Sequence, residues 1–222
     1  MVKQIAHIET PFREKFGVPR QAGLVDYEAR VVFEPEYRVQ EAVRGLEEFD
    51  YIWLLWHFHL AEREEWSPTV RPPRLGGNRR VGVFATRSPF RPNPIGLSSV
   101  RLLRVEPGPV LVVSGADLVD GTPILDIKPY IPYADSHPDA RGGFAQEAPA
   151  PLLQVVDDHG LLEQLPAIER QALVESLRHD PRPHYQHDPQ RLYTMSFGHW
   201  EVRFRVDDGF VEVLQIFPVT KA

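Results

Sequence analysis

The chain has 222 residues, of which 42% are hydrophobic and 25% are charged, enough apolar material for one domain with an appendage or for two small domains. Cysteine is absent, which excludes disulfides, cysteine-ligated metals and cysteine nucleophiles, and no stretch resembles a signal peptide or is apolar for long enough to cross a bilayer. The formal net charge is −6, and we expect a soluble cytoplasmic protein with no membrane partner.

The first part of the chain has the sequence patterns of β-strands. Gln4 to Glu9 predicts a strand, and Leu24 to Phe33 alternates apolar and polar residues with the period of a half-buried strand. The prolines and glycines of residues 10–23 predict a loop between them. Glu36 to Leu46 carries apolar residues at helical spacing and predicts a helix, and the aromatic run Tyr51 to His59 predicts a strand.

His57 and His59 alternate on that aromatic strand and therefore share one face. Two histidines at this spacing could contribute to a zinc site, but no third ligand lies nearby in the sequence. We therefore expect partly buried, hydrogen-bonded histidines and no bound metal.

Positive charge is concentrated between residues 63 and 104. This stretch has nine arginines, no lysine and two acids, inside a chain of negative net charge. Arginine favours planar, bidentate contacts with phosphate and stacks on bases. A solvated face with ion pairs is the alternative, but the clustering favours an anionic ligand, with nucleic acid foremost. The arginines are Arg63, Arg71, Arg74, Arg79, Arg80, Arg87, Arg91, Arg101 and Arg104.

Residues 87–98 form the most informative stretch of this basic zone. Three prolines within six residues exclude a helix interior or a central strand and predict a stiff loop. The loop holds two of the arginines, Arg87 and Arg91, together with Asn93. A structural corner is the alternative, but a corner has no need of two guanidinium groups, so we expect a functional loop.

Strands are expected on both sides of this loop and after it. Residues 81–86, 95–105, 110–118 and 124–130 are apolar runs separated by turn signals. Many short strands with one helix predict a mainly β fold, an antiparallel barrel or sandwich.

The last of these strands carries two opposite charges. Alternation places Ile124, Asp126 and Lys128 on one face and Leu125 and Ile127 on the other. The acid and the lysine form either a structural salt bridge or a proton-accepting carboxylate whose pKa the lysine sets.

A proline- and glycine-rich stretch, residues 136–151, predicts a linker arm. After it, Leu161, Leu165, Ile168 and Ala172 keep helical spacing and predict a helix that Pro181 and Pro183 end. Three strands are expected at the end of the chain, the last two joined by an Asp-Asp-Gly turn: 191–197, 200–206 and 210–217. We expect a barrel domain with its arm over residues 1–151 and a small α+β domain over 152–222.

Familiar catalytic signatures are missing. The chain has neither the glycine-rich dinucleotide fingerprint nor a P-loop nor a nucleophile elbow. The residues alone therefore predict a β-rich protein with an anionic partner, without naming a reaction.

Two long runs resemble the signatures of the TrmO family, also called YaeB or TsaA-like. They read ATRSPFRPNPIG at 85–96 and DGTPILDIKPY at 120–130. Shorter matches at 15–21, 71–78 and 180–183 extend the resemblance over nearly the whole chain. It implies a homodimeric tRNA methyltransferase that binds S-adenosylmethionine on a β-barrel. The acceptor it implies is N6 of threonylcarbamoyl-adenosine, 3′ of the anticodon in a threonine tRNA.

The resemblance also implies which residues contact the cofactor. They fall on three separate parts of the chain, namely Pro19, Arg20 and Gln21; His59, Leu60, Arg87 and Leu97; and Asp117, Leu118, Asp120, Gly121 and Thr122. An arginine such as Arg87 can hold the cofactor carboxylate bidentately.

The acceptor nitrogen is urea-like and must lose a proton, so a base is useful. Our candidate is Asp126, with Lys128 and Tyr130 orienting the base or the threonyl carboxylate. Arg91 and Asn93 are candidates for positioning the nucleotide, and Arg71, Arg74, Arg79 and Arg80 for contacting tRNA phosphates.

Two alternatives stay open at this point. One is a module that senses S-adenosylmethionine without transferring its methyl group, and the other is a methyltransferase for a small anionic metabolite. A plain RNA-binding protein is a weaker third, and indifference to the cofactor would distinguish it.

Overall fold

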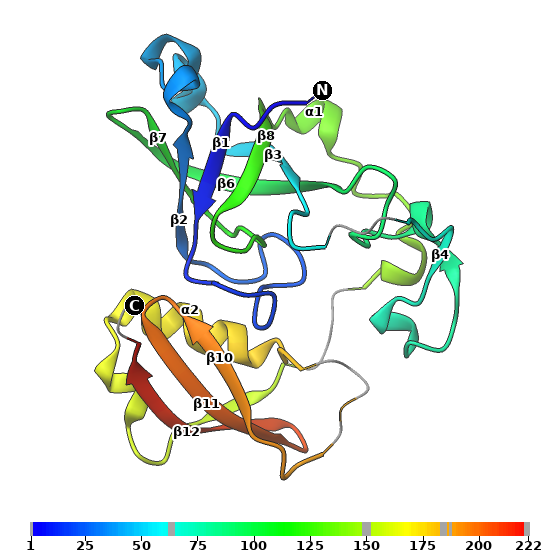
Figure 1. Ribbon diagram of the computed structural model, residues 1–222, viewed down its shortest axis with the longest axis vertical. Helices are drawn as coiled ribbons and strands as arrows, with labels where there is room; N and C mark the ends of the chain where they lie inside the picture. Colours follow the sequence, from blue (N-terminus) through cyan, green and yellow to red (C-terminus); the bar gives the residue numbers. More distant parts are fainter. Residues whose placement is uncertain (1, 62–64, 148–151, 183–185, 187, 220–222) are drawn as a thin grey trace.

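The computed structural model describes residues 2–61, 65–147, 152–182, 186 and 188–219. Figure 1 shows two β-structures, a barrel formed by the first part of the chain and a sheet with one helix formed by the last part. Among the described residues, no helix is long and apolar enough to cross a membrane.

Six antiparallel strands close into the barrel, which confirms the mainly β fold expected from the sequence. Their order around it is β1 (Ala6–Glu9), β2 (Glu28–Phe33), β7 (Val110–Ser114), β6 (Ile95–Glu106), β3 (Tyr51–His57) and β8 (Thr122–Pro129). Alternate residues point inward, as the buried pattern of β3 illustrates, where Ile52 and Leu54 are fully buried and their neighbours are not.

The helix predicted over Glu36 to Leu46 is wrong. Three short 3-10 turns occupy this region instead: η1 (Pro35–Tyr37), η2 (Gln40–Val43) and η3 (Leu46–Glu48). Val43 is the one buried residue in these turns, so a longer helix would have no apolar face to pack. Gly45, at φ +82°, breaks the chain between η2 and η3.

The strand predicted over residues 81–86 is also largely wrong. Only β5 (Val81–Gly82) is extended, paired with β4 (Thr69–Val70), and η5 (Val83–Ala85) follows directly. Val83 is completely buried while Phe84 is exposed, so this small hairpin and its turn pack locally, away from the barrel, on the side labelled β4 in Figure 1.

A bulge in β8 corrects the predicted faces of that strand. Asp126 pairs with Leu55, but Ile124 pairs with the next residue of β3, so Leu125 is the extra residue. Ile124 therefore lies inside the barrel, whereas Asp126 and Lys128 point outward. The expectation that Ile124 shares their face was wrong, because strict alternation does not anticipate a bulge.

The last part of the chain forms a four-stranded sheet with a helix. Its strands lie in the order β10 (Tyr193–Phe197), β11 (Trp200–Asp207), β12 (Phe210–Pro218) and β9 (Gln154–Val156), with β9 parallel to β12. The strand β9 was not predicted. The helix α1 (Pro132–Asp135) directly precedes the linker arm, and η6 (Gly143–Ala145) lies within it.

The helical segment is shorter than the spacing predicts. Residues Leu161–Gln164 form the 3-10 turn η7, and α2 covers Ala167–Arg178. Pro166 separates the two and shifts the helical face, so that Ile168 is 69% exposed while Leu173 and Leu177 are buried.

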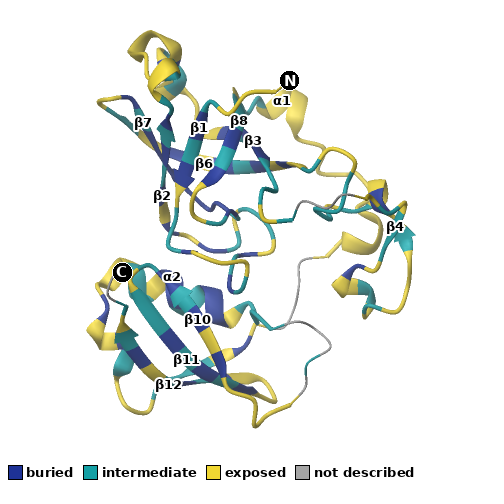
Figure 2. Cartoon of the chain, viewed as in Figure 1, coloured by how far each residue is buried: buried dark blue, intermediate teal, exposed yellow. Residues whose placement is uncertain are grey.

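Residues 10–23, expected as a loop, lie between the barrel and the second sheet. Phe12 contacts Tyr27 on the barrel side and Phe197 on the sheet side, with ring centroids 5.2 and 5.5 Å away. The N–H of Gly198 donates to Pro11 at 2.7 Å. One apolar core therefore continues through this loop, as the buried residues in Figure 2 indicate.

Candidate functional site

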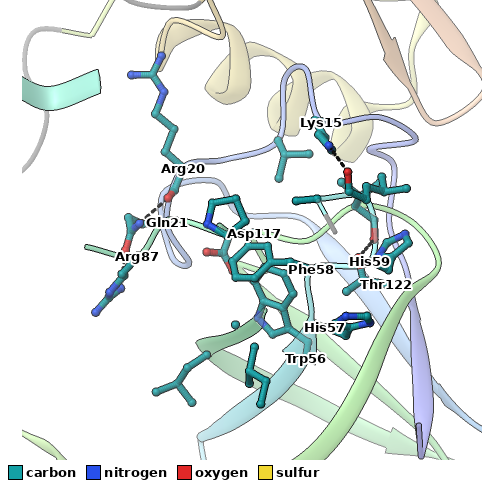
Figure 3. Close-up of a pocket in the computed structure, with 18 of the residues that line it drawn as sticks. Lys15, Arg20, Gln21, Trp56, His57, Phe58, His59, Arg87, Asp117 and Thr122 are labelled. Carbon is teal, nitrogen blue, oxygen red and sulfur yellow. Dashed lines mark hydrogen bonds between the residues drawn. The ribbon is translucent and has the colours of Figure 1, made fainter. Parts of the chain in front are cut away.

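A cavity of about 480 Å³ opens where the loop of residues 15–21 meets one end of the barrel. Its wall also includes the end of β3 with the residues after it, the proline-rich loop, the start of β6, and the turn before β8. The segments singled out in the sequence are thus brought together (Figure 3). The volume is within the range of small-molecule sites.

Most of the residues predicted to bind the cofactor line this cavity. They are Pro19, Arg20, Gln21, His59, Leu60, Arg87, Leu97, Asp117 and Thr122. Leu118, Asp120 and Gly121 do not belong to the lining. Leu118 is buried in the core, the Asp120 carboxylate accepts from the Thr10 N–H at 2.9 Å, and the Gly121 N–H donates to Ile8. These three residues shape the turn that presents their neighbours.

Aromatic rings that the sequence analysis did not single out form part of the cavity wall. Trp56 and Phe58 pack at 4.2 Å between centroids, and both line the cavity. Gly96 lies against the Trp56 ring so closely that a Cβ there would be 2.2 Å from it. The aromatic run of β3 and the glycine in the motif were the available sequence signals, but neither shows whether a given ring points into the cavity.

Asp117 is the acidic residue of the described cavity lining, and it lies near Trp56 and Phe58 (Figure 3). The Trp56 indole N–H donates to the Ser98 hydroxyl at 2.9 Å, and that hydroxyl donates to Asp117. Burial raises the pKa of the Asp117 carboxyl, and the Ser98 hydroxyl and Arg87 oppose this rise. Burial and this carboxylate together raise the pKa of Tyr27 well above its usual value.

Arg87 and Gln21 connect two sides of the cavity rim. The Arg87 guanidinium donates to the Gln21 side-chain oxygen, and the Gln21 amide donates to the backbone oxygen of Arg20 at 2.5 Å. On another part of the rim, the Lys15 ammonium donates to the backbone oxygen of Leu60. The predicted cofactor residues therefore hold one another in position.

Arg20 differs from its neighbours because its side chain leaves the cavity. Figure 3 shows it extending away from the other lining residues. Its guanidinium donates to the backbone oxygens of Asp180 and Arg182 at 2.7 and 2.8 Å. Asp180, at φ +49°, forms an ion pair with Arg182 at 2.9 Å. Burial alone would raise the pKa of Asp180, but the bonds and charge of Arg182 lower it overall.

The candidate catalytic residues lie beside the cavity rather than in its lining. Asp126 and Lys128 form an ion pair of 2.8 Å on the outer face of β8. The Tyr130 ring lies 5.6 Å from the ring of Trp53, which does line the cavity. These residues thus lie on or just after β8, the strand next to β3, and Trp53 of β3 lines the cavity. Their catalytic roles stay a prediction.

The arginines of the basic zone have unequal surroundings. Arg71 and Arg79 are exposed, whereas Arg74 donates to Glu147 and Arg80 to Thr69 at 3.4 Å. Arg104 forms ion pairs with Glu28 and Glu106, so its charge is compensated, and Arg63 lies outside the described residues.

Arg91 lines the cavity, but its guanidinium donates to the backbone oxygens of Val83 and Thr86, which fixes the loop. Asn93 is exposed and outside the lining.

His57 and His59 both line the cavity, and the His59 N–H donates to the backbone oxygen of His57 at 2.8 Å. Over the described ranges, no group of three histidine or acidic side chains could hold a metal ion.

Comparisons with known proteins agree across the whole chain. Residues 7–136 match the family model of the tRNA-methyltransferase O N-terminal domain, and residues 144–219 match that of the TrmO C-terminal domain. A tRNA (adenine(37)-N6)-methyltransferase of Escherichia coli is 44% identical, and the alignment covers 97% of each chain.

Matches from Pseudomonas aeruginosa include a curated relative and a solved structure. A putative S-adenosylmethionine-dependent methyltransferase is 47% identical over 86% of each chain. The crystal structure of a TrmO superposes with a TM-score of 0.78 at 36% identity, covering 98% of this chain and 96% of that one.

Proposed function

The chain belongs to the TrmO family of S-adenosylmethionine-dependent tRNA (adenine-N6)-methyltransferases, and we propose that its acceptor is the N6-threonylcarbamoyl adenosine 3′ of the anticodon in a threonine tRNA. The observation that carries the proposal is the cavity in which the family motifs converge around Asp117.

The donors and rings of the cavity fit S-adenosylmethionine. Arg87 on the rim suits the cofactor carboxylate, while Asp117 and the faces of Trp56 and Phe58 suit its positively charged groups. Leu97 adds an apolar surface for the adenine. When bound, this cofactor supplies an electrophilic methyl group on a positively charged sulfur.

The protein's own contribution is positioning and proton removal. The hydrogen bond between Arg87 and Gln21 fixes this part of the cavity wall. A fixed wall limits where the bound methyl donor can lie, so that the acceptor nitrogen can approach the methyl group closely and in line. We propose that Asp126 takes the proton from N6 and that Lys128 binds the threonyl carboxylate. Both lie on the same outer face as Leu97, because Leu55 pairs with Leu97 on one side and with Asp126 on the other.

We propose a division of work between the two parts of the chain. The barrel and arm, residues 1–151, hold the cofactor and the reacting groups, and residues 152–222 add to tRNA binding. The exposed arginines Arg71 and Arg79 extend the phosphate-binding surface. We further propose that the enzyme is a homodimer and works in the cytoplasm, where its tRNA substrate is found.

Transfer of labelled methyl from S-adenosylmethionine tests the proposal directly. Threonine tRNA carrying the threonylcarbamoyl base is compared with the same tRNA lacking it. We expect label only on the modified tRNA, and label on both would contradict the requirement for the threonylcarbamoyl group.

The same assay includes Asp126→Asn, for which we expect a loss of about 10²-fold or more in kcat with unchanged cofactor affinity. Normal turnover of this variant would exclude Asp126 as the base. Cofactor binding without transfer to either tRNA would favour a sensor.

A further inference from the structure

The outer face of the barrel carries a row of aromatic side chains next to the cavity. Tyr51 and Trp53 alternate with buried residues on β3 and therefore point outward, and Tyr130 follows the end of β8. The Tyr130 N–H donates to the backbone oxygen of Tyr51 at 3.0 Å, which places the three residues together. We call Tyr51, Trp53 and Tyr130 the aromatic shelf.

The rings of the aromatic shelf touch one another and reach the cavity. Tyr130 lies 6.3 Å from Tyr51 and 5.6 Å from Trp53 between ring centroids. Trp53 is itself part of the cavity wall. The shelf therefore extends from the cavity outward along β3, and its outer end, Tyr51, is 45% exposed.

The ring of the shelf that is nearest the cavity, Trp53, is held in place. The Trp53 indole N–H donates to the Asp135 carboxylate at 2.9 Å, and the same carboxylate accepts from the Ile131 N–H at 2.8 Å. These two bonds, the backbone one first, lower the pKa of Asp135, so it stays an ionised acceptor at neutral pH. A ring fixed in this way presents a preformed stacking surface at little entropic cost.

Cationic side chains flank the shelf on both neighbouring strands. Arg101 of β6 pairs with Tyr51, and Lys128 of β8 pairs with Trp53, so each charge points outward beside a ring. Both side chains are exposed. Rings that stack on bases, between cations that contact phosphates, are the combination by which proteins bind single-stranded nucleic acid.

We propose that the aromatic shelf stacks unpaired nucleotides that neighbour the target adenosine, while Arg101 contacts their phosphates. The proposal rests on the tRNA substrate of the proposed function. Anticodon-loop bases are unpaired and present their faces to aromatic side chains. The carboxylates beside the shelf, Asp126 and Asp135, are already bonded to Lys128 and to Trp53 with Ile131. The charge of Arg101 therefore favours a polyanionic occupant such as RNA over a second copy of the chain.

The experiment measures binding of a fluorescent anticodon stem-loop RNA to the full-length protein. Tyr51→Ala is compared with Tyr51→Phe, which keeps the ring. We expect Tyr51→Ala to weaken RNA binding about tenfold, Tyr51→Phe to bind nearly normally, and both to bind S-adenosylmethionine like the wild type. Equal binding by the alanine variant, or an equal loss in the phenylalanine variant, would overturn stacking on this ring.

A comparison of two arginine variants completes the test. Arg101→Gln should reduce the salt dependence of RNA binding by about one phosphate contact, whereas Arg44→Gln, at an arginine that is 78% exposed on a different segment, should not. Identical salt slopes for both variants would contradict the phosphate contact.

Sedimentation velocity on Tyr51→Ala detects the competing occupant. A change of oligomeric state would show that a second copy covers the shelf and would overturn the proposal. Because binding is measured on RNA without turnover, a wild-type enzyme that binds the stem-loop but transfers no methyl would contradict the proposed function and leave the shelf supported.

Discussion

Burial raises the pKa of the Asp117 carboxyl in the cavity wall, although the Ser98 hydroxyl donates to it. A raised pKa means that the folded protein holds the proton more tightly than the unfolded chain does. The contribution of Asp117 to stability therefore falls as pH rises from its ordinary pKa through the raised one, and the charged form is unfavourable above both. The loss of stability from burying this charge is consistent with a binding role, because a partly buried carboxylate is suited to a positively charged ligand.

Asp117→Asn tests this balance between burial and charge. At pH 7 we expect a higher melting temperature than in the wild type, because the amide removes a buried charge, together with weaker binding of S-adenosylmethionine. As pH falls through the raised pKa of Asp117, the two proteins should converge in stability. Thermal unfolding and calorimetric titration at several pH values measure both effects. A less stable variant at pH 7 would mean that the hydrogen bonds to the carboxylate outweigh its burial.

At the scale of elements, β6 connects the fold to the site. Its first residues line the cavity, and Gly96 allows the Trp56 ring of β3 to lie flat against it. The Trp56 N–H then reaches Ser98, two residues along the same strand. One strand thus fixes both the ring and the hydroxyl that donates to Asp117.

Gly96→Ala should disturb this arrangement. The new Cβ would be 2.2 Å from the indole ring of Trp56, so this ring, which lines the cavity, must shift. We expect a loss of about 1–3 kcal/mol in unfolding free energy, as for other overpacked cores, and weaker cofactor binding. Gly82→Ala is the matched control, since a Cβ there meets nothing within 4 Å. Denaturant unfolding of both variants checks the prediction, and similar losses in both would contradict it.

Much of the fold could be read from the sequence, because its long strands keep a clear two-residue alternation. The predicted strand over 95–105 agrees with β6 to one residue. The helix over Glu36 to Leu46 failed because spacing alone does not show whether a core lies beside it. The motifs that converge on the cavity could be recognised in the sequence. The direction of the Arg20 side chain could not be predicted from it, because its partners are 160 and 162 residues away in the chain.

The loop of residues 10–23 joins the barrel to the second sheet. Phe16 stacks on Tyr193 and Phe204 of the sheet, with centroids 6.2 Å apart in each pair. Gly17 packs against Met195, where a Cβ would overlap the sulfur. The same loop continues into Pro19, Arg20 and Gln21 of the cavity wall. The second sheet therefore supports one wall of the proposed cofactor site.

Arg20→Lys tests this support. Both bonds are donated by one guanidinium nitrogen, Nη2; a lysine keeps the charge, but its side chain is one atom shorter and its ammonium stops short of the backbone oxygens of Asp180 and Arg182. We expect a several-fold higher KM for S-adenosylmethionine with a nearly unchanged kcat, because the wall is loosened and the reacting groups are not. Arg13→Lys, at an exposed position of the same loop, is the control. A normal KM in Arg20→Lys would mean that the wall keeps its position without the second sheet.

The placement of this loop also has a consequence for synthesis on the ribosome. The last barrel strand ends at residue 129, whereas the surface that holds Phe16 and Gly17 begins at residue 193. A nascent chain can close its barrel long before that surface emerges, so its cofactor loop has nothing to rest on. We therefore expect the wall of the proposed cofactor site to reach its final position only when the second sheet is complete, so that a chain truncated during translation carries the signature motifs with a looser wall.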